Sequence, residues 1–360
     1  MITPLIIAAL LGTGCSDINP TYTPPSDQDT QTGTATGFAL GADISWTTKL
    51  ESEGEVFYNS EGTATECTAL MKELGMDAIR LRVWVDPEDG WSSRSDVLAK
   101  ALRAQKLGMR IMIDFHYSDT WADPARQLIP QAWLEYNTEQ LAQAVTDHTT
   151  DVLTLLKDNG VEVTWVQVGN EVTHGMLRHT EVDEDNNGST LSQYGGDLGS
   201  QSANFAAFID AGYSAVKSVY PDAQVVVHVD RGHNIYYANA VFSVLDTYDA
   251  DYDIIGLSLY PGSNWQEPVE NCIANISTLY STYGHDVMIV ETGMDYSAPD
   301  TAYEMLSYLI ENSEATGHCL GVFYWEPEAP AGYNNGYNMG AFDGGRPTHA
   351  LDAFTEAAGQ

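Results

Sequence analysis

The sequence predicts a single (β/α)8 TIM barrel, because eight short apolar runs alternate along the chain with stretches of amphipathic helical pattern. The runs are rich in β-branched residues and largely apolar on both faces, as expected for a parallel sheet that helices cover. In chain order they span 38–44, 78–84, 110–115, 164–169, 224–229, 253–258, 286–291 and 321–325.

Helical segments fill most of the gaps between these strands. Residues 96–107 and 141–159 carry apolar side chains at helical spacing. Several helices end at a glycine just before the next strand, where the chain needs a left-handed residue; these are Gly75, Gly108, Gly160 and Gly284. A doubly wound open sheet is the alternative, which is disfavoured because no GxGxxG motif follows the first strand.

The first 37 residues differ in character from the predicted barrel domain at 38–360. Residues 1–15 join a short apolar run to small residues and a cysteine, which is typical of a bacterial lipoprotein signal peptide with Cys15 as the acylated residue. A plain secretory signal and a wrongly assigned start codon are the alternatives. Residues 16–37 predict a flexible polar linker. We expect an exported protein, either secreted or held at the cell surface or outer membrane by this anchor alone.

The charge balance limits the classes of partner. The chain has 51 Asp and Glu against 15 Lys and Arg, a formal net charge of −36. Binding to nucleic acid or to an anionic membrane surface needs clustered Lys and Arg, so neither is expected. The sequence indicates no oligomer, and we expect a monomer whose partners are neutral or cationic.

Three cysteines follow Cys15, so at most one disulfide can form among them. We expect a Cys272–Cys319 disulfide, with three buried free thiols, including Cys67, as the alternative.

The ends of the predicted strands carry the residues suited to chemistry. In a (β/α)8 barrel the active site lies at the C-terminal ends of the strands. Glu171 follows the fourth strand, and Glu291 ends the seventh. Other polar and aromatic residues at strand ends are Arg80, Arg82, Trp84, Asp114, His116, Asp119, Trp121, His228, Asp230, Ser258, Tyr260, Trp325 and Glu326.

Opposed carboxyl groups beside aromatic rings are what cleavage of a glycosidic bond requires. One carboxyl group protonates the leaving oxygen, and the other attacks the anomeric carbon or activates water. Trp and Tyr rings cover the apolar faces of sugars. An Arg beside one glutamate would keep it ionised, while burial would keep the other protonated.

Six segments make a family resemblance specific. They are GADISW (41–46), IRLRVWVDP (79–87), DFHYSDTWADP (114–124), VGNEVTHGML (168–177), VETG (290–293) and GVFYWEPE (321–328). Together they resemble the glycoside hydrolase family 53 endo-β-1,4-galactanases over roughly residues 38–355. The resemblance implies a retaining endo-hydrolase of β-1,4-galactan, the side chain of pectic arabinogalactan.

The resemblance also implies roles for individual residues. Glu171 would be the general acid/base and Glu291 the nucleophile, with Asn170 bonded to the 2-hydroxyl of the sugar at the cleaved bond. The other substrate-binding residues would be Arg80 or Arg82 and Tyr260 beside Glu291, Trp121 and Trp325 as sugar platforms, and Asp119, His116 and Glu326 along the cleft.

The chemistry requires no cofactor, but a structural calcium ion is one hypothesis. Some relatives hold calcium in a long loop after strand seven, and the corresponding loop of this chain is short. After strand four, Asp183, Asp185 and Asn187 match the first half of a D-x-D-x-N-G calcium loop, although Tyr194 stands where an EF-hand has Glu.

Two other functions are compatible with parts of the pattern. A glucanase, mannanase or xylanase of the same clan would share the two glutamates but not SDTWADP. A surface glycan-binding lipoprotein without catalysis would not need both glutamates. For a retaining enzyme we expect the two carboxyl groups to lie about 5–5.5 Å apart.

Overall fold

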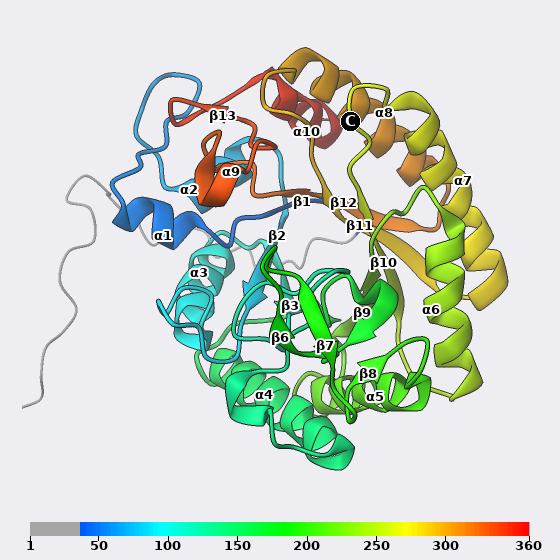
Figure 1. Ribbon diagram of the computed structural model, residues 1–360. Helices are drawn as coiled ribbons and strands as arrows, with labels where there is room; N and C mark the ends of the chain where they lie inside the picture. Colours follow the sequence, from blue (N-terminus) through cyan, green and yellow to red (C-terminus); the bar gives the residue numbers. More distant parts are fainter. Residues whose placement is uncertain (1–36, 360) are drawn as a thin grey trace, which may run out of the picture.

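The computed structural model describes residues 37–359, which form a closed barrel of parallel strands surrounded by helices (Figure 1). Around the barrel the order is β1-β2-β3-β4-β9-β10-β11-β12, and β12 pairs with β1 to close it. The barrel strands are β1 (Ala39–Asp43), β2 (Ala78–Val83), β3 (Arg110–Phe115), β4 (Trp165–Val168), β9 (Gln224–Val229), β10 (Ile254–Leu259), β11 (Asp286–Thr292) and β12 (Cys319–Trp325). The predicted fold class is confirmed, and all eight predicted strands are present.

Helices cover the outer face of the barrel and end where the sequence indicates. Asn137 and Gln140 cap the start of α4 reciprocally. Gly75, Gly108 and Gly160 follow α2, α3 and α4 with φ between 66° and 90°. The helices are α1 (Thr47–Ser52), α2 (Cys67–Glu73), α3 (Arg94–Lys106), α4 (Thr138–Asp158), α5 (Ser202–Val219), α6 (Ile235–Thr247), α7 (Gln266–Tyr283), α8 (Pro299–Ala315), α9 (Tyr333–Gly336) and α10 (Asp352–Ala358), with 3-10 turns η1 (Gln131–Trp133), η2 (Val172–His174) and η3 (His349–Leu351).

Small two-stranded sheets decorate the loops. The connection from β4 to α5 contains two pairs, β5 (Gly175–Met176) with β8 (Gly196–Asp197) and β6 (His179–Val182) with β7 (Gly188–Leu191). A third pair, β13 (Phe342–Asp343) with β14 (Arg346–Pro347), follows β12. The loop between β11 and α8 is short, as predicted, and spans residues 293–298.

Side-chain alternation along the strands separates two cores. One set of residues packs outward against the helices, and a smaller apolar cluster fills the barrel interior. Gly41 is required in that interior, because a Cβ atom there would lie 2.4 Å from the Phe323 ring. The interior cluster is Ala39, Ala78, Met112, Trp165, Val226, Ile254, Met288, Val290 and Phe323.

The predicted Cys272–Cys319 disulfide is wrong, because both residues are buried free thiols, as is Cys67. Cys272 lies on the buried face of α7, whereas the Cys319 thiol at the start of β12 hydrogen-bonds the Gly321 carbonyl oxygen. The alternative of three buried thiols therefore holds.

The predictions for the N-terminal segment concern residues that the structure does not describe. The signal peptide at 1–15, the acylated Cys15 and most of the linker at 16–37 lie outside the described residues, so they stay predictions. Within 37–359, none of the helices has the length and apolarity that a membrane span requires.

Candidate active site

An inward-facing polar layer lies above the apolar interior, toward the C-terminal ends of the strands. On several strands, the side chain two residues after the apolar interior residue also points into the barrel, and it is polar or charged. Arg80 follows Ala78 in this way, and Asp114 follows Met112. The residues of this layer are Asp43, Arg80, Asp114, Gln167, His228 and Ser258, all buried. Buried charged groups need ion-pair or hydrogen-bond partners, so the side chains of this layer are held in fixed positions next to the residues that they contact.

Glu291, at the end of β11, forms an ion pair with an arginine and accepts a hydrogen bond from a tyrosine. Its Oε1 lies 2.9 Å from Arg80 Nη1, and its Oε2 accepts a hydrogen bond of 3.0 Å from the Tyr260 hydroxyl. Arg80 is fully buried and also pairs with Asp43 and Asp114 at 2.7 and 2.9 Å. The structure thus assigns Arg80, and not Arg82, to the side of Glu291.

Glu171 has a different environment, made of neutral groups. The Ser258 hydroxyl donates a 2.7 Å hydrogen bond to its Oε1, and Ser258 Oγ lies 2.7 Å from His228 Nε2. No Lys or Arg among residues 37–359 forms an ion pair with it. Glu171 also has a left-handed backbone, with φ 44° and ψ 53°, a strained conformation that is concentrated at functional sites.

The two carboxyl groups face each other across a short gap. One oxygen of Glu171 and one of Glu291 lie within 4.8 Å of each other. Burial raises the pKa of Glu171 well above its usual value, and the Glu291 charge raises it further. Burial also raises the pKa of Glu291, but the Arg80 guanidinium opposes this rise and leaves the pKa at about 7. Glu291 therefore ionises first, while Glu171 keeps its proton.

Asn170 is held with one amide hydrogen to spare. Its Oδ1 accepts hydrogen bonds from Arg80 and Gln167 at 3.0 and 3.1 Å, and its Nδ2 donates to the Ala122 carbonyl oxygen at 2.8 Å. The second hydrogen on Nδ2 is available to a ligand hydroxyl.

A cluster of tryptophans lies around Trp46, which follows β1. The Trp46 ring centroid lies 5.7 Å from that of Trp121 and 5.4 Å from that of Trp325, and the latter two are half-buried. The Arg82 guanidinium carbon lies 4.2 Å from the Trp121 ring centroid. We refer to Trp46, Trp121 and Trp325 as the tryptophan cluster.

Two predicted cleft residues have their hydrogen-bonding atoms occupied by the protein. His116 accepts hydrogen bonds from Trp84 and Ala122 at Nδ1 and bonds Asp114 at Nε2. Glu326, fully buried, pairs with Arg82 at 2.9 Å and accepts from the Trp46 backbone N–H. The structure places His116, Glu326 and Arg82 next to the tryptophan cluster, and that His116 and Glu326 bind substrate stays a prediction.

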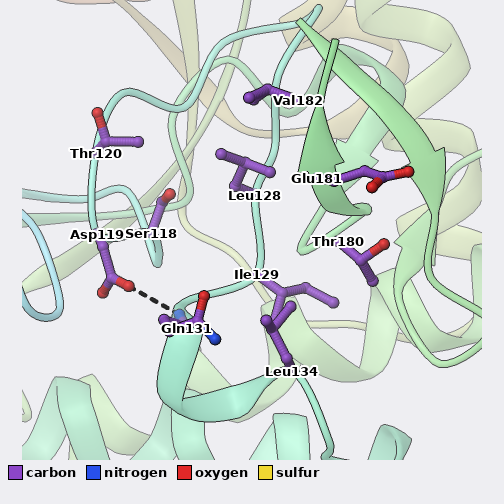
Figure 2. A pocket seen from close by; sticks show the side chains of 10 residues that line it. All are labelled: Ser118, Asp119, Thr120, Leu128, Ile129, Gln131, Leu134, Thr180, Glu181 and Val182. Carbon is purple, nitrogen blue, oxygen red and sulfur yellow. Dashed lines mark hydrogen bonds between the residues drawn. The ribbon is translucent and has the colours of Figure 1, made fainter. Parts of the chain in front are cut away.

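Asp119 lies beside a separate pocket of about 340 Å³ (Figure 2). Its Oδ1 accepts from the Asp86 backbone N–H and its Oδ2 from that of Gln131, the dashed line in Figure 2. The pocket is bounded by the loop after β3 and by β6. These contacts give Asp119 a role in holding the loop that carries Trp121.

One group of three potential metal ligands occurs in the part of the chain that the structure describes, namely Glu171, His228 and Glu291. The neighbours of His228 already occupy its ring nitrogens, because Ser258 bonds Nε2 and the Glu171 backbone N–H donates to Nδ1. The Asp183, Asp185 and Asn187 segment forms the turn between β6 and β7, where Asp183 Oδ1 accepts from the backbone N–H groups of the other two. Calcium binding by this turn stays a prediction.

Five residues of the site were not assigned a role from the sequence. Each sits at or near the C-terminal end of a strand, so strand alternation was the available signal, but their partners come from other strands. They are Asp43, Trp46, Gln167, His228 and Ser258.

The comparisons with known proteins identify the family. The family model for glycosyl hydrolase family 53 matches residues 39–354. This chain belongs to glycosyl hydrolase family 53. Within the family, it is 35% identical to an uncharacterised protein of Niallia circulans, over 72% of this chain and 68% of that one.

Relatives with named activities and a solved structure share between 25% and 30% sequence identity with this family 53 protein. It is 30% identical to an arabinogalactan endo-β-1,4-galactanase of Aspergillus niger, over 80% of this chain and 84% of the relative. It is 28% identical to the endo-β-1,4-galactanase of Bacillus subtilis, over 81% and 70%. The family 53 catalytic domain of Ignisphaera aggregans superposes with a TM-score of 0.75 at 25% identity, over 90% of this chain and 97% of that one.

Proposed function

We propose that this protein is an endo-hydrolase of β-1,4-galactosidic bonds in galactan and in the arabinogalactan side chains of pectin. The single observation that carries the proposal is the facing pair Glu171 and Glu291, with oxygens within 4.8 Å of each other inside a family 53 barrel. The relatives of Aspergillus niger and Bacillus subtilis bear the names of galactanases, which supports galactan as the substrate.

The proposed reaction is a double displacement in which the anomeric configuration is retained. In the first step an oxygen of Glu291 attacks the anomeric carbon, and the bond from that carbon to the leaving oxygen breaks. The Glu171 proton passes to the leaving oxygen, which departs as a hydroxyl group. The order of the pKa values supports these roles, because the nucleophile must be ionised while the acid is protonated.

In the second step water hydrolyses the glycosyl-enzyme. The Glu171 carboxylate takes a proton from the water, whose oxygen attacks the anomeric carbon and releases the Glu291 carboxylate. The remaining hydrogen on Asn170 Nδ2 is placed to donate to the sugar 2-hydroxyl at this bond. The spacing of the two carboxyl groups favours this route, since inversion requires about 6.5–9.5 Å.

The decisive experiment is to incubate the protein with β-1,4-galactan, cellulose, mannan and xylan and to follow new reducing ends. We expect release of galacto-oligosaccharides from galactan only. Proton NMR of the first products should show the β-anomer before mutarotation. Activity on another polymer in preference to galactan would refute the substrate, and an initial α-anomer would refute the mechanism.

A further inference from the structure

We propose that an aromatic surface beside Glu171 binds the part of the galactan chain that leaves in the first step. It consists of His174, Tyr236 and Tyr237, and we refer to it as the leaving-group platform. The inference rests on the proposed function, because it takes Glu171 as the acid that protonates the leaving oxygen.

Two neighbouring strands place the platform at the mouth of the barrel. His174 ends η2, three residues after Glu171 in the loop that follows β4. Tyr236 and Tyr237 lie in the first turn of α6, in the segment that follows β9. Strands β4 and β9 are hydrogen-bonded neighbours, so the segments after them emerge side by side at the catalytic end.

A chain of contacts connects the platform to the residues next to Glu171. The Thr173 hydroxyl donates a 2.6 Å hydrogen bond to Asp230 Oδ1. Asp230 Oδ2 pairs with Arg231 Nε at 3.2 Å, and Arg231 Nη1 donates to the Tyr237 hydroxyl at 2.7 Å. The Arg231 guanidinium carbon also lies 4.8 Å from the Tyr237 ring centroid. These contacts hold the Tyr237 ring in a fixed orientation.

The three rings form a connected but open surface. The Tyr237 ring stands edge-on to the His174 ring at 6.4 Å between centroids and to the Tyr236 ring at 5.6 Å. Tyr236 is 71% exposed, and His174 is exposed as well. Adjacent exposed rings with polar edges are suited to sugars, whose apolar faces cover the ring and whose hydroxyls bond the edge.

The position of the platform across the barrel mouth identifies the part of the substrate that it would contact. The tryptophan cluster belongs to the segments after β1 and β3 and to the end of β12, which are grouped on one side of the barrel. The platform belongs to the segments after β4 and β9, on another side. A galactan chain that lies across Glu171 and Glu291 would meet the tryptophan cluster with one end and the platform with the other. The end on the Glu171 side is the leaving group.

The test compares two substrates that differ only in what leaves. In galactan the leaving group is a galactosyl chain, whereas in β-1,4-galactobiosyl fluoride it is fluoride, which reaches no platform. For the double variant Tyr236→Ala/Tyr237→Ala we expect kcat/KM on galactan to fall about tenfold, the loss of two stacking contacts. We expect kcat/KM on the fluoride to stay within about twofold of the unchanged protein, because fluoride makes no stacking contact. Transfer of galactosyl units to added galactobiose should fall in parallel with galactan hydrolysis.

A matched control lies on the same helix. Tyr248, which follows the last residue of α6, is 47% exposed, and its hydroxyl lies 3.3 Å from Ser202 Oγ at the start of α5, so Tyr248→Ala should change neither rate. Tyr237→Phe keeps the ring and should retain most of the galactan activity.

Equal falls on both substrates, or no fall on galactan, would overturn the platform while the proposed function stands. Absence of galactan hydrolysis by the unchanged protein would instead refute the proposed function itself.

Discussion

The two facing glutamates have opposite kinds of neighbour. Glu291 lies against a buried guanidinium, which two further carboxylates, Asp43 and Asp114, hold in place. Glu171 lies against a serine hydroxyl, and behind it lies the imidazole of His228. Burial shifts the pKa of both glutamates upward, and only the Glu291 side has a cation that opposes the shift.

The comparison shows how one residue type can serve two roles in one site. The desolvation of two carboxyl groups favours the neutral form of each, and mutual repulsion prevents both from being ionised together. A single cation on one side decides which of them is ionised. The same logic explains why His228 stays neutral, since burial and Arg80 together push its pKa well below the usual value.

Replacing each glutamate in turn is the largest test of this comparison. Glu171→Gln should lower kcat on galactan by about 10²- to 10⁴-fold, the contribution of a general acid, and should cost much less on galactobiosyl fluoride, whose leaving group needs no proton. Glu291→Gln should abolish turnover of both substrates, because no nucleophile is left. An equal loss on both substrates for Glu171→Gln, or turnover of either substrate by Glu291→Gln, would contradict the assigned roles.

Removing the cation should make the two sides alike. Arg80→Met deprives three buried carboxyl groups of their only ion-pair partner of the Arg or Lys type in the described part of the chain, so we expect a loss of about 3–5 kcal/mol in the free energy of unfolding. The pKa of Glu291 should rise without the cation, and since activity needs its ionised form, the acidic limb of the kcat/KM profile should move to higher pH.

Two variants control for the Arg80 effect. Arg94→Met breaks a surface ion pair with Asp151 and should cost less than about 1 kcal/mol. Arg80→Lys keeps the charge and should keep the acidic limb close to its original pH. An unchanged limb in Arg80→Met would show that Arg80 does not set the ionisation of Glu291.

Removing the hydroxyl beside Glu171 should change the pKa of Glu171 and with it the alkaline limb of the kcat/KM profile. The Ser258 hydrogen bond lowers the pKa of Glu171, so Ser258→Ala should raise that pKa. Activity needs protonated Glu171, and the alkaline limb of the profile should therefore move up by about one pH unit. Ser243→Ala, on the exposed face of α6, should leave the profile unchanged. A downward shift would contradict the assigned direction of the hydrogen bond.

A smaller test asks whether burial without a neighbouring cation also raises the pKa of a glutamate outside the reacting pair. Glu328 is buried, accepts a hydrogen bond from the Thr47 hydroxyl, and has its pKa raised well above normal by burial and by Glu326. A raised pKa stabilises the fold below the unfolded pKa of about 4.5, and this stability is lost as pH rises toward the folded value. Glu328→Gln should leave the melting temperature unchanged at about pH 4 and raise the free energy of unfolding at about pH 8 by about 1 kcal/mol.

The surface substitution Glu88→Gln controls for charge alone in this experiment. It should produce no comparable difference between the two pH values. The same gain at both pH values for Glu328→Gln would point to packing and not to ionisation.

Strand pattern and spacing were sufficient to predict most of this molecule. Short runs such as 110–115 are apolar on both faces and recur between helical segments, so the barrel, its elements and the ends of β4 and β11 followed directly. The disulfide was mispredicted because proximity of Cys272 and Cys319 in the last quarter of the chain says nothing about where each thiol points.

Contacts across the barrel were beyond the reach of the sequence. Arg80 and Arg82 lie two residues apart on the same strand and point the same way, yet Arg80 pairs with Glu291 and Arg82 with Glu326. The sequence also did not indicate the partners of His116 and Glu326, which the structure gives as Asp114 and Trp84 for His116 and the Trp46 backbone for Glu326.

The sequence by itself determined that two glutamates would stand at the mouth of a parallel barrel, because local periodicity and strand ends are properties of short segments. The resemblance implied an arginine beside Glu291, but only the tertiary structure decided that this arginine is Arg80 and that the Ser258 hydroxyl lies beside Glu171. The neighbour of Glu291 is Arg80, which belongs to β2 and lies far from Glu291 in the sequence. The neighbour of Glu171 is Ser258, which belongs to β10 and follows Glu171 by 87 residues. Their effect on a pKa depends on distances of a few ångströms that closure of the barrel sets.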